Sequence, residues 1–186
     1  MMRSLALTLV CLLAAPAARG AEPRKAERER ADVEDVLATP DGQFVVILKT
    51  RDAPQRFLPI WIGENEAMAI RWRLDRYTPP RPLTLNLLET MMQTSNIKLV
   101  EINIDSLKGG VFLGRLHLRQ SGRNWDVDAR PSDAIGLALG RNAAIWVSRQ
   151  VIDEAGVDTR DLIGRDNAAP ERDTPRPGAS SYEESL

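Results

Sequence analysis

Acidic and basic side chains alternate between residues 101 and 128, and this is the first place where the sequence offers groups able to do chemistry. The residues concerned are Glu101, Asp126 and Asp128 together with Arg115, His117, Arg119 and Arg123. Carboxylates beside guanidinium groups on one surface suit the binding of a metal ion and a phosphate. The alternative is a solvated sheet face laced by cross-strand ion pairs, each worth less than about 1 kcal/mol. The spacing alone favours the ion pairs.

The histidine and cysteine content excludes several kinds of site. His117 is the only histidine, so a metal site built from several histidines is excluded. Cys11 is the only cysteine, and it lies within an apolar segment that we expect to be removed. The mature chain would then have no thiol nucleophile, no zinc–thiolate site and no disulfide.

Residues 1–20 have the features of a secretory signal peptide. Arg3 supplies a positive start, residues 5–15 are uninterruptedly apolar, and Ala18 and Gly20 place small residues where a signal peptidase cleaves. The apolar run is too short to span a bilayer. We therefore expect cleavage before Ala21 and export to the periplasm or the medium, with no membrane attachment of the mature protein.

The composition fits a single globular domain. The chain has 186 residues, of which 43% are hydrophobic and 27% charged, and its formal net charge is −1. This balance excludes a strongly basic arm, so a nucleic acid would have to be bound by a local patch. Residues 21–30 form a charged lead-in, residues 31–157 the expected domain, and residues 158–186, rich in Pro, Ala, Ser and charge, an expected disordered tail.

Hydrophobic patterning predicts an α+β fold, in which three to four helices pack on a twisted, mainly antiparallel sheet. Asp41-Gly42 is a strong hairpin signal between two of the expected strands. The sequence predicts strands over residues 33–37, 43–49, 56–62, 97–105, 111–120, 123–128 and 144–147. It predicts helices over residues 64–77, 82–93, 131–139 and 148–155.

The three strands between residues 97 and 128 form a meander whose turns set the cross-strand register. With turns centred near Lys108 and between Ser121 and Gly122, we expect Glu101, Arg115 and Asp128 to line up. Residues 99, 117 and 126 would lie beside them on the same face. The opposite face is expected to carry the core residues Ile102, Ile104, Phe112, Leu116, Leu118, Trp125 and Val127. Further core filling is expected from Trp61, Trp72, Met91 and Met92.

Three segments resemble the signature segments of the bifunctional nuclease family of small DNase/RNase domains. They are LPIWIGENEAMAI (58–70), PPRPLTLNLL (79–88) and DARPSDAIGLAL (128–139), and their order and spacing also match. The resemblance covers about residues 31–157. It implies an α+β fold and hydrolysis of phosphodiester bonds in RNA or DNA with low sequence specificity. The second segment departs from the family's usual Arg-Pro-Leu-Thr-His-Asp, because Leu85 and Asn86 occupy the last two places.

The family segments contain the side chains that phosphodiester cleavage would use. Glu66, Asp128 and Asp133 are the candidate ligands of Mg²⁺ or Mn²⁺, which would activate a water. Asp128 and Asp133 are also the candidate catalytic carboxylates, and Arg81 and Arg130 would stabilise charge on the phosphorane. Each residue has a structural alternative. A carboxylate in the first turn of a helix favours the helix dipole, Arg130 suits an ion pair with Asp128 or Asp133, and Arg81 between prolines suits a locked loop.

Two functions therefore remain open from the sequence. The first is an exported nuclease that acts on RNA or DNA with the assistance of a divalent metal. The second is a catalytically inactive family member that acts as an interaction domain, and a homo-oligomer is compatible with it. Leu85 and Asn86 favour the second function, because a His and an Asp at these positions could serve as general base or metal ligand. The intact segment at residues 128–134 favours the first.

Overall fold

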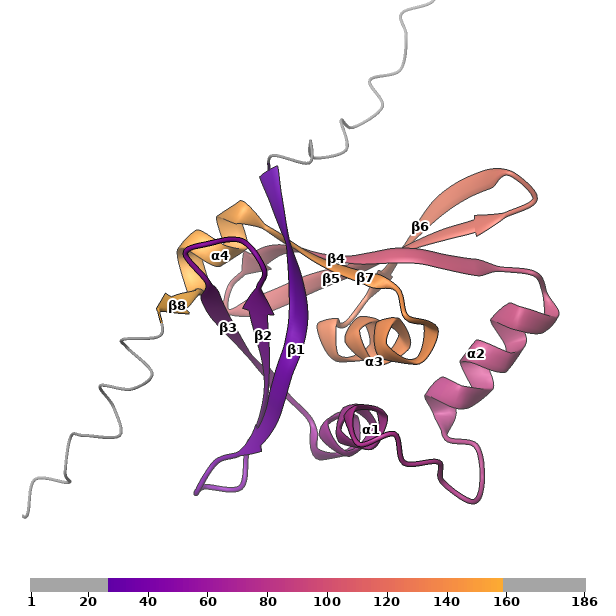
Figure 1. Cartoon of the computed structure of the whole chain (residues 1–186), viewed down its shortest axis with the longest axis horizontal. Coiled ribbons are helices and arrows are strands. Elements are labelled where there is room, and N and C mark those ends of the chain that lie inside the picture. The colour runs from indigo at the N-terminus through magenta and orange to yellow at the C-terminus, as the bar shows by residue number, and fades with distance from the viewer. Residues whose placement is uncertain (1–26, 159–186) are drawn as a thin grey trace, which may run out of the picture.

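The computed structural model describes residues 27–158, which form an eight-stranded sheet and four helices (Figure 1). In chain order the elements are β1 (Arg28–Ala38), β2 (Phe44–Thr50), β3 (Arg56–Ile62), α1 (Glu64–Leu74), α2 (Thr84–Thr94), β4 (Lys98–Lys108), β5 (Val111–Gln120), β6 (Arg123–Ala129), α3 (Pro131–Arg141), β7 (Ala144–Ser148), α4 (Arg149–Ala155) and β8 (Val157–Asp158). The predicted elements are all confirmed. The short strand β8 was not predicted.

The sheet joins two antiparallel meanders through one inserted strand. Its strand order is β6-β5-β4-β7-β1-β2-β3-β8, and only the β4–β7 pair is parallel within the described residues. Strand β7 thus lies between β4 of the second meander and β1 of the first. The predicted α+β class with a mainly antiparallel sheet is confirmed.

Helix α3 occupies the centre of the molecule. In Figure 1 it lies below the strands β4, β5 and β7, with α1 beneath it and α2 to its right. Ile135 is fully buried in this helix, and Leu137 is 1% exposed. They pack in one apolar cluster with Leu48, Ile102 and Ile104, which come from both meanders. Burial of such side chains is the main force that holds the helix on the sheet.

The register of the second meander agrees with the prediction in one hairpin and differs in the other. In the β5–β6 pair, Arg115 lies opposite Asp128 and His117 opposite Asp126, as expected. In the β4–β5 pair, however, Glu101 lies opposite His117 instead of Arg115. The pairing is irregular at two places in β4, between residues 99 and 101 and between residues 104 and 106. A bulge re-aims the side chains of a strand, so residue 99, expected on the charged face, is buried in the core.

Three side chains expected in the core are instead exposed. Val127 is 39% exposed because β6 is an edge strand, and Met91 of α2 is 58% exposed. Trp61 is 59% exposed because it lies on the face of β3 opposite the buried Leu58 and Ile60. Met92, at 5% exposure, is core filling as predicted, and residue 72 is half-buried.

The ends of the elements also differ slightly from the prediction. Helix α1 ends at Leu74 and does not reach residue 77, because Arg76 has a left-handed backbone (φ 54°). Strand β1 begins at Arg28, within the expected lead-in, and Glu29 is buried there and paired with Arg149. No helix within residues 27–158 has the length and apolar character needed to cross a membrane. The expected signal peptide, the start of the lead-in and the expected tail after residue 158 lie outside the described residues.

Candidate functional site

A cleft of about 410 Å³ opens where β3, the β4–β5 turn and the start of α3 meet. It is lined by residues 60–63, 110–112 and 130–132. The first and last of these stretches belong to two of the three segments singled out in the sequence. The fold therefore brings together segments that lie about seventy residues apart in the chain.

Arg130 forms the cationic centre of a cluster at this cleft. Its Nε donates to Asp133 Oδ2 at 2.7 Å, and its Nη2 donates to Asp133 Oδ1 at 3.1 Å and to Glu66 Oε1 at 2.6 Å. These hydrogen bonds, that to Asp133 first, raise the pKa of Arg130, so the side chain is always charged. The Arg130 side chain nevertheless remains 65% exposed. The two donors of its Nη1 take part in no hydrogen bond within residues 27–158.

The local sequence explains how two helices direct carboxylates at one arginine. Arg130 is the N-cap of α3, followed by Pro131, and Asp133 lies in the first turn three residues later. Glu66 takes the same position in α1, three residues after the N-cap Gly63. A Cβ atom on Gly63 would lie 2.3 Å from Glu66 Oε2, so the glycine makes room for this carboxylate. Both carboxylates also favour the positive end of their helix dipole.

The structure brings together Glu66, Arg130 and Asp133 but not the other predicted site residues. Asp128 lies opposite Arg115 in the sheet and, by alternation along β6, shares a face with residue 126. Arg81 is exposed in the connection between α1 and α2. Of the predicted site residues only Arg130 lines the cleft itself, and Glu66 and Asp133 are joined to it by their bonds to Arg130.

The three predicted metal ligands do not form one ligand set in this arrangement. Among residues 27–158, no group of three His, Cys, Asp or Glu side chains is placed to hold a metal ion. Glu66 and Asp133 both bind the guanidinium of Arg130, which takes the position of a cation between them. Asp128 lies opposite Arg115 in the β5–β6 pair. Metal assistance therefore stays a prediction from the sequence.

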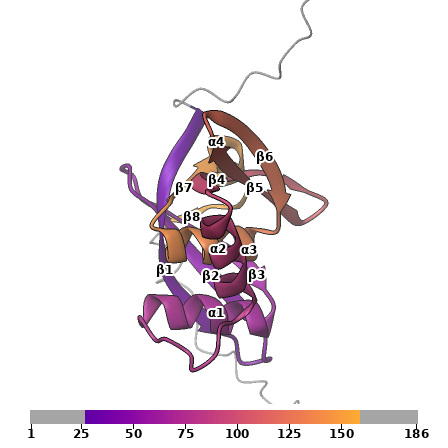
Figure 2. The same cartoon turned by 90° about the vertical axis from the view of Figure 1, so that its right-hand side faces the viewer.

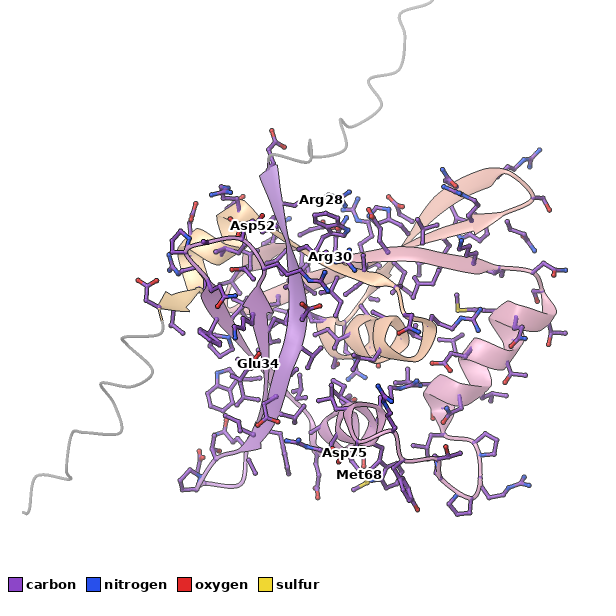
Figure 3. All side chains as sticks on the ribbon, viewed as in Figure 1. Arg28, Arg30, Glu34, Asp52, Met68 and Asp75 are labelled. Carbon is purple, nitrogen blue, oxygen red and sulfur yellow. The ribbon has the colours of Figure 1, made fainter. Side chains whose placement is uncertain are left out.

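His117 belongs to a separate polar network on the charged face of the sheet. Its Nδ1 lies 2.5 Å from Asp126 Oδ1, and its Nε2 lies 2.5 Å from the amide nitrogen of Asn103. Since the amide donates to Nε2, Nδ1 carries the proton and donates to the carboxylate. Arg28 of β1 donates to Asn103 and to Glu101, and Figure 3 shows Arg28 near the upper end of that strand.

Both ring nitrogens of His117 are therefore engaged, and neither can take a proton from a water in this arrangement. Arg115 adds ion pairs to Asp105 at 2.9 Å and to Asp126 at 3.6 Å. The alternating charges thus link strands β1, β4, β5 and β6 to one another. This supports the ion-pair interpretation of the charged face.

Leu85 and Asn86, the two departures from the family segment, both have structural roles. Leu85 packs against α3 at Gly136, where a Cβ atom would lie 2.5 Å from Leu85 Cδ1. Asn86 Oδ1 accepts a hydrogen bond of 3.1 Å from the backbone N–H of Leu83 and so caps the start of α2. Neither residue lines the cleft, so the departures leave the Arg130 cluster intact.

Trp61 is the residue of the cleft that sequence reasoning placed wrongly. It lines the cleft together with Arg130, although it was expected in the core. The alternation along β3 predicts its exposure: Leu58 and Ile60 point into the core, and Trp61, one residue after Ile60, points to the other face. The apolar run of this strand hid that alternation.

Comparison with known proteins places all the residues that line the cleft within one protein family. The model of the bifunctional nuclease domain matches residues 46–160, a range that includes every residue lining the cleft. An uncharacterized protein of Mycobacterium tuberculosis is 37% identical over 118 residues, which are 63% of this chain and 70% of the relative. Bifunctional nuclease 1 of Oryza sativa subsp. japonica and the bifunctional nuclease of Oryza minuta are each 26% identical over 109 residues, 57% of this chain and 33% of those relatives.

Proposed function

Because the chain belongs to the bifunctional nuclease domain family, we propose that it hydrolyses phosphodiester bonds of RNA or DNA at the Arg130 cleft. One observation carries this proposal. Arg130 is held by two carboxylates and is still open to solvent in a cleft built from two family segments. A planar guanidinium with two unused donors is suited to phosphate oxygens.

Arg130 and its two partners have different roles in this proposal. The Nη1 donors of Arg130 bind a non-bridging phosphate oxygen and stabilise the charge that develops on it during attack. Asp133 uses both oxygens to fix the guanidinium, whereas Glu66 uses only Oε1, which leaves Oε2 without a hydrogen bond within residues 27–158. Glu66 Oε2 accepts the proton of the attacking water as the water oxygen bonds to phosphorus. The ester oxygen leaves with the electron pair of the broken P–O bond and takes up a proton from solvent.

The test compares cleavage of labelled single-stranded RNA and DNA by the wild type, Arg130→Gln and Arg30→Gln. Arg30 is an exposed arginine on β1, away from the cleft, and serves as the matched control (Figure 3). We expect Arg130→Gln to lose about 100-fold or more in kcat/KM, while Arg30→Gln keeps the wild-type value. Parallel reactions with Mg²⁺, Mn²⁺ or EDTA test the predicted metal assistance. Equal cleavage by wild type and Arg130→Gln would place the activity elsewhere.

The alternative function as an interaction domain is favoured by the surface of α2. Leu83, Leu87, Leu88 and Met91 are 37% to 58% exposed at this helix. Figure 2 shows α2 in front of α3, on the outside of the molecule. Such a surface suits association, including a homo-oligomer. A well-folded wild type that cleaves neither nucleic acid but sediments as an oligomer would favour this function over the nuclease.

We also propose that the protein acts after export, because residues 1–20, which lie outside the described residues, have the features of a secretory signal peptide. Expression of the whole chain followed by fractionation and N-terminal sequencing tests this. We expect a mature protein that begins at Ala21. An intact Met1 in the cytoplasmic fraction would contradict it.

A further inference from the structure

Trp61 is an exposed aromatic side chain at the site proposed for phosphate binding. It is 59% exposed, whereas tryptophan is highly buried on average. It lines the same cleft as Arg130, and Leu58 and Ile60 fill the core on the other face of β3. The indole of Trp61 therefore does not contribute to the core of the protein.

The part of the cleft that the β4–β5 turn contributes is also apolar. Val111, which follows the β4–β5 turn, is 61% exposed, and Phe112 is half-buried beside it. Gly110, the last residue of the turn, has a left-handed backbone (φ 80°) and no side chain to fill the cleft. The cleft thus combines apolar walls with one guanidinium, and a nucleotide likewise combines a flat apolar base with a charged phosphate.

The charge of the cluster shows that phosphate attraction alone gives little affinity. Glu66 and Asp133 carry two negative charges and Arg130 one positive charge, so the cluster has a net charge of about −1 at neutral pH. The whole chain is also at −1. Proteins that bind nucleic acid mainly through phosphates have an excess of basic residues. Binding at this cleft needs a second, uncharged contribution.

We propose that Trp61 is a stacking platform for an unpaired base and makes the cleft selective for single-stranded nucleic acid. This inference rests on the proposed nuclease function of the same cleft. Bases of a duplex are already stacked on their neighbours, so their faces cannot reach the indole. An unpaired base can turn out and stack, and stacking tolerates any base because each has a π-face. This accounts for binding without sequence preference.

The test is a cycle that removes the base and the indole separately. The probe is a fluorescein-labelled 12-nucleotide phosphorothioate DNA, used as a single strand, as a duplex, and as a strand of equal charge that carries abasic sites. We expect the wild type to bind the complete single strand about 10-fold more tightly than the other two probes. Trp61→Ala should bind all three equally weakly, and Trp61→Phe should keep part of the preference.

Tyr77→Ala is the matched control, because Tyr77 is an aromatic residue with 52% exposure that does not line the cleft. It should keep the wild-type preference, and circular dichroism checks the fold of each variant. A Trp61→Ala protein that still prefers the complete single strand would overturn the inference. So would a wild type that binds the three probes equally.

Cleavage separates failure of this inference from failure of the proposed function. Cleavage that depends on Arg130 but is unchanged in KM by Trp61→Ala would overturn the stacking role and leave the nuclease in place. Absence of cleavage with an intact base-dependent binding would overturn the nuclease and keep the stacking platform as a binding site. A KM for single strands that rises about 10-fold in Trp61→Ala, with kcat nearly unchanged, supports both.

Discussion

Two carboxylates from different helices share the guanidinium of Arg130, and this sharing decides which atoms can meet a ligand. Asp133 accepts hydrogen bonds from the arginine through both of its oxygens, while Glu66 accepts through Oε1 alone. Arg130 Nη1 and Glu66 Oε2 are consequently the donor and the acceptor that remain for a substrate and a water. In the proposed function the arginine therefore contacts the phosphate and the glutamate accepts the proton.

Glu66→Gln tests this assignment at the level of one atom. The amide keeps the size of the side chain and its bond to Arg130 but cannot accept a proton, so kcat should fall by about 100-fold or more. The matched control is Glu64→Gln, since Glu64 is an exposed carboxylate in the same turn of α1. Initial rates on labelled RNA measure both variants. Full activity of Glu66→Gln would remove Glu66 from the proton-transfer step.

At the scale of elements, helix α2 supports α3 but supplies nothing to the cleft. Leu85 packs at Gly136 of α3, while Leu87 on the same helix is 57% exposed. Arg73 of α1 and Glu89 of α2 form a 2.8 Å ion pair that crosses Gly140 of α3. The second family segment is thus a packing segment in this chain.

Leu85→Ala should therefore lower stability without lowering activity. Loss of a half-buried leucine at a helix contact costs about 2 kcal/mol, near the lower end for such truncations. Leu87→Ala, the same change on the exposed side of α2, should stay within about 0.5 kcal/mol of the wild type. Urea denaturation measures the free energy of unfolding, and cleavage per folded molecule should be equal in both. A selective loss of activity in Leu85→Ala would give α2 a role in the site.

The sequence predicted these elements well because each is encoded locally. Alternation and turn residues marked the strands, and Pro131 marked the start of α3, although the N-cap is Arg130 and not Ser132 as the sequence suggests. The bulges of β4 could not be predicted, because a bulge depends on how a neighbouring strand fits. For that reason the predicted partner of Glu101 is wrong. The exposure of Trp61 was missed for a different reason, because the apolar sequence of β3 hides its alternation.

At the scale of the whole molecule, β7 inserts between the two meanders and brings distant segments together. This pairing joins residues 28–31 to residues 145–148, a separation that no local pattern reveals. The hydrogen bond between Glu66 and Arg130 likewise depends on the tertiary structure, which places α1 beside the start of α3. The sequence could therefore name both residues as candidates but could not pair them.

Asn103→Ala tests how the network around His117 holds the two halves of the sheet together. Asn103 is 4% exposed and bonds to both Arg28 and His117, so its removal takes one hydrogen-bond partner from each of these partly buried groups. The free energy of unfolding should fall by about 2 kcal/mol. Asn124→Ala, at an exposed position bonded to Arg119, is the control and should change stability little. Equal denaturation curves for the two variants would contradict a structural role of the network.

If the guanidinium of Arg130 stabilises the charge on the phosphate, added guanidinium should rescue a variant that lacks this side chain. The measurement is kcat/KM on labelled single-stranded RNA for the wild type and Arg130→Ala, with and without millimolar guanidinium chloride. We predict a loss of about 100-fold or more in the variant and a partial recovery when guanidinium fills the vacated position between Glu66 and Asp133. Cleavage by Arg130→Ala within twofold of the wild type, unaffected by guanidinium, would show that Arg130 has no part in the chemistry.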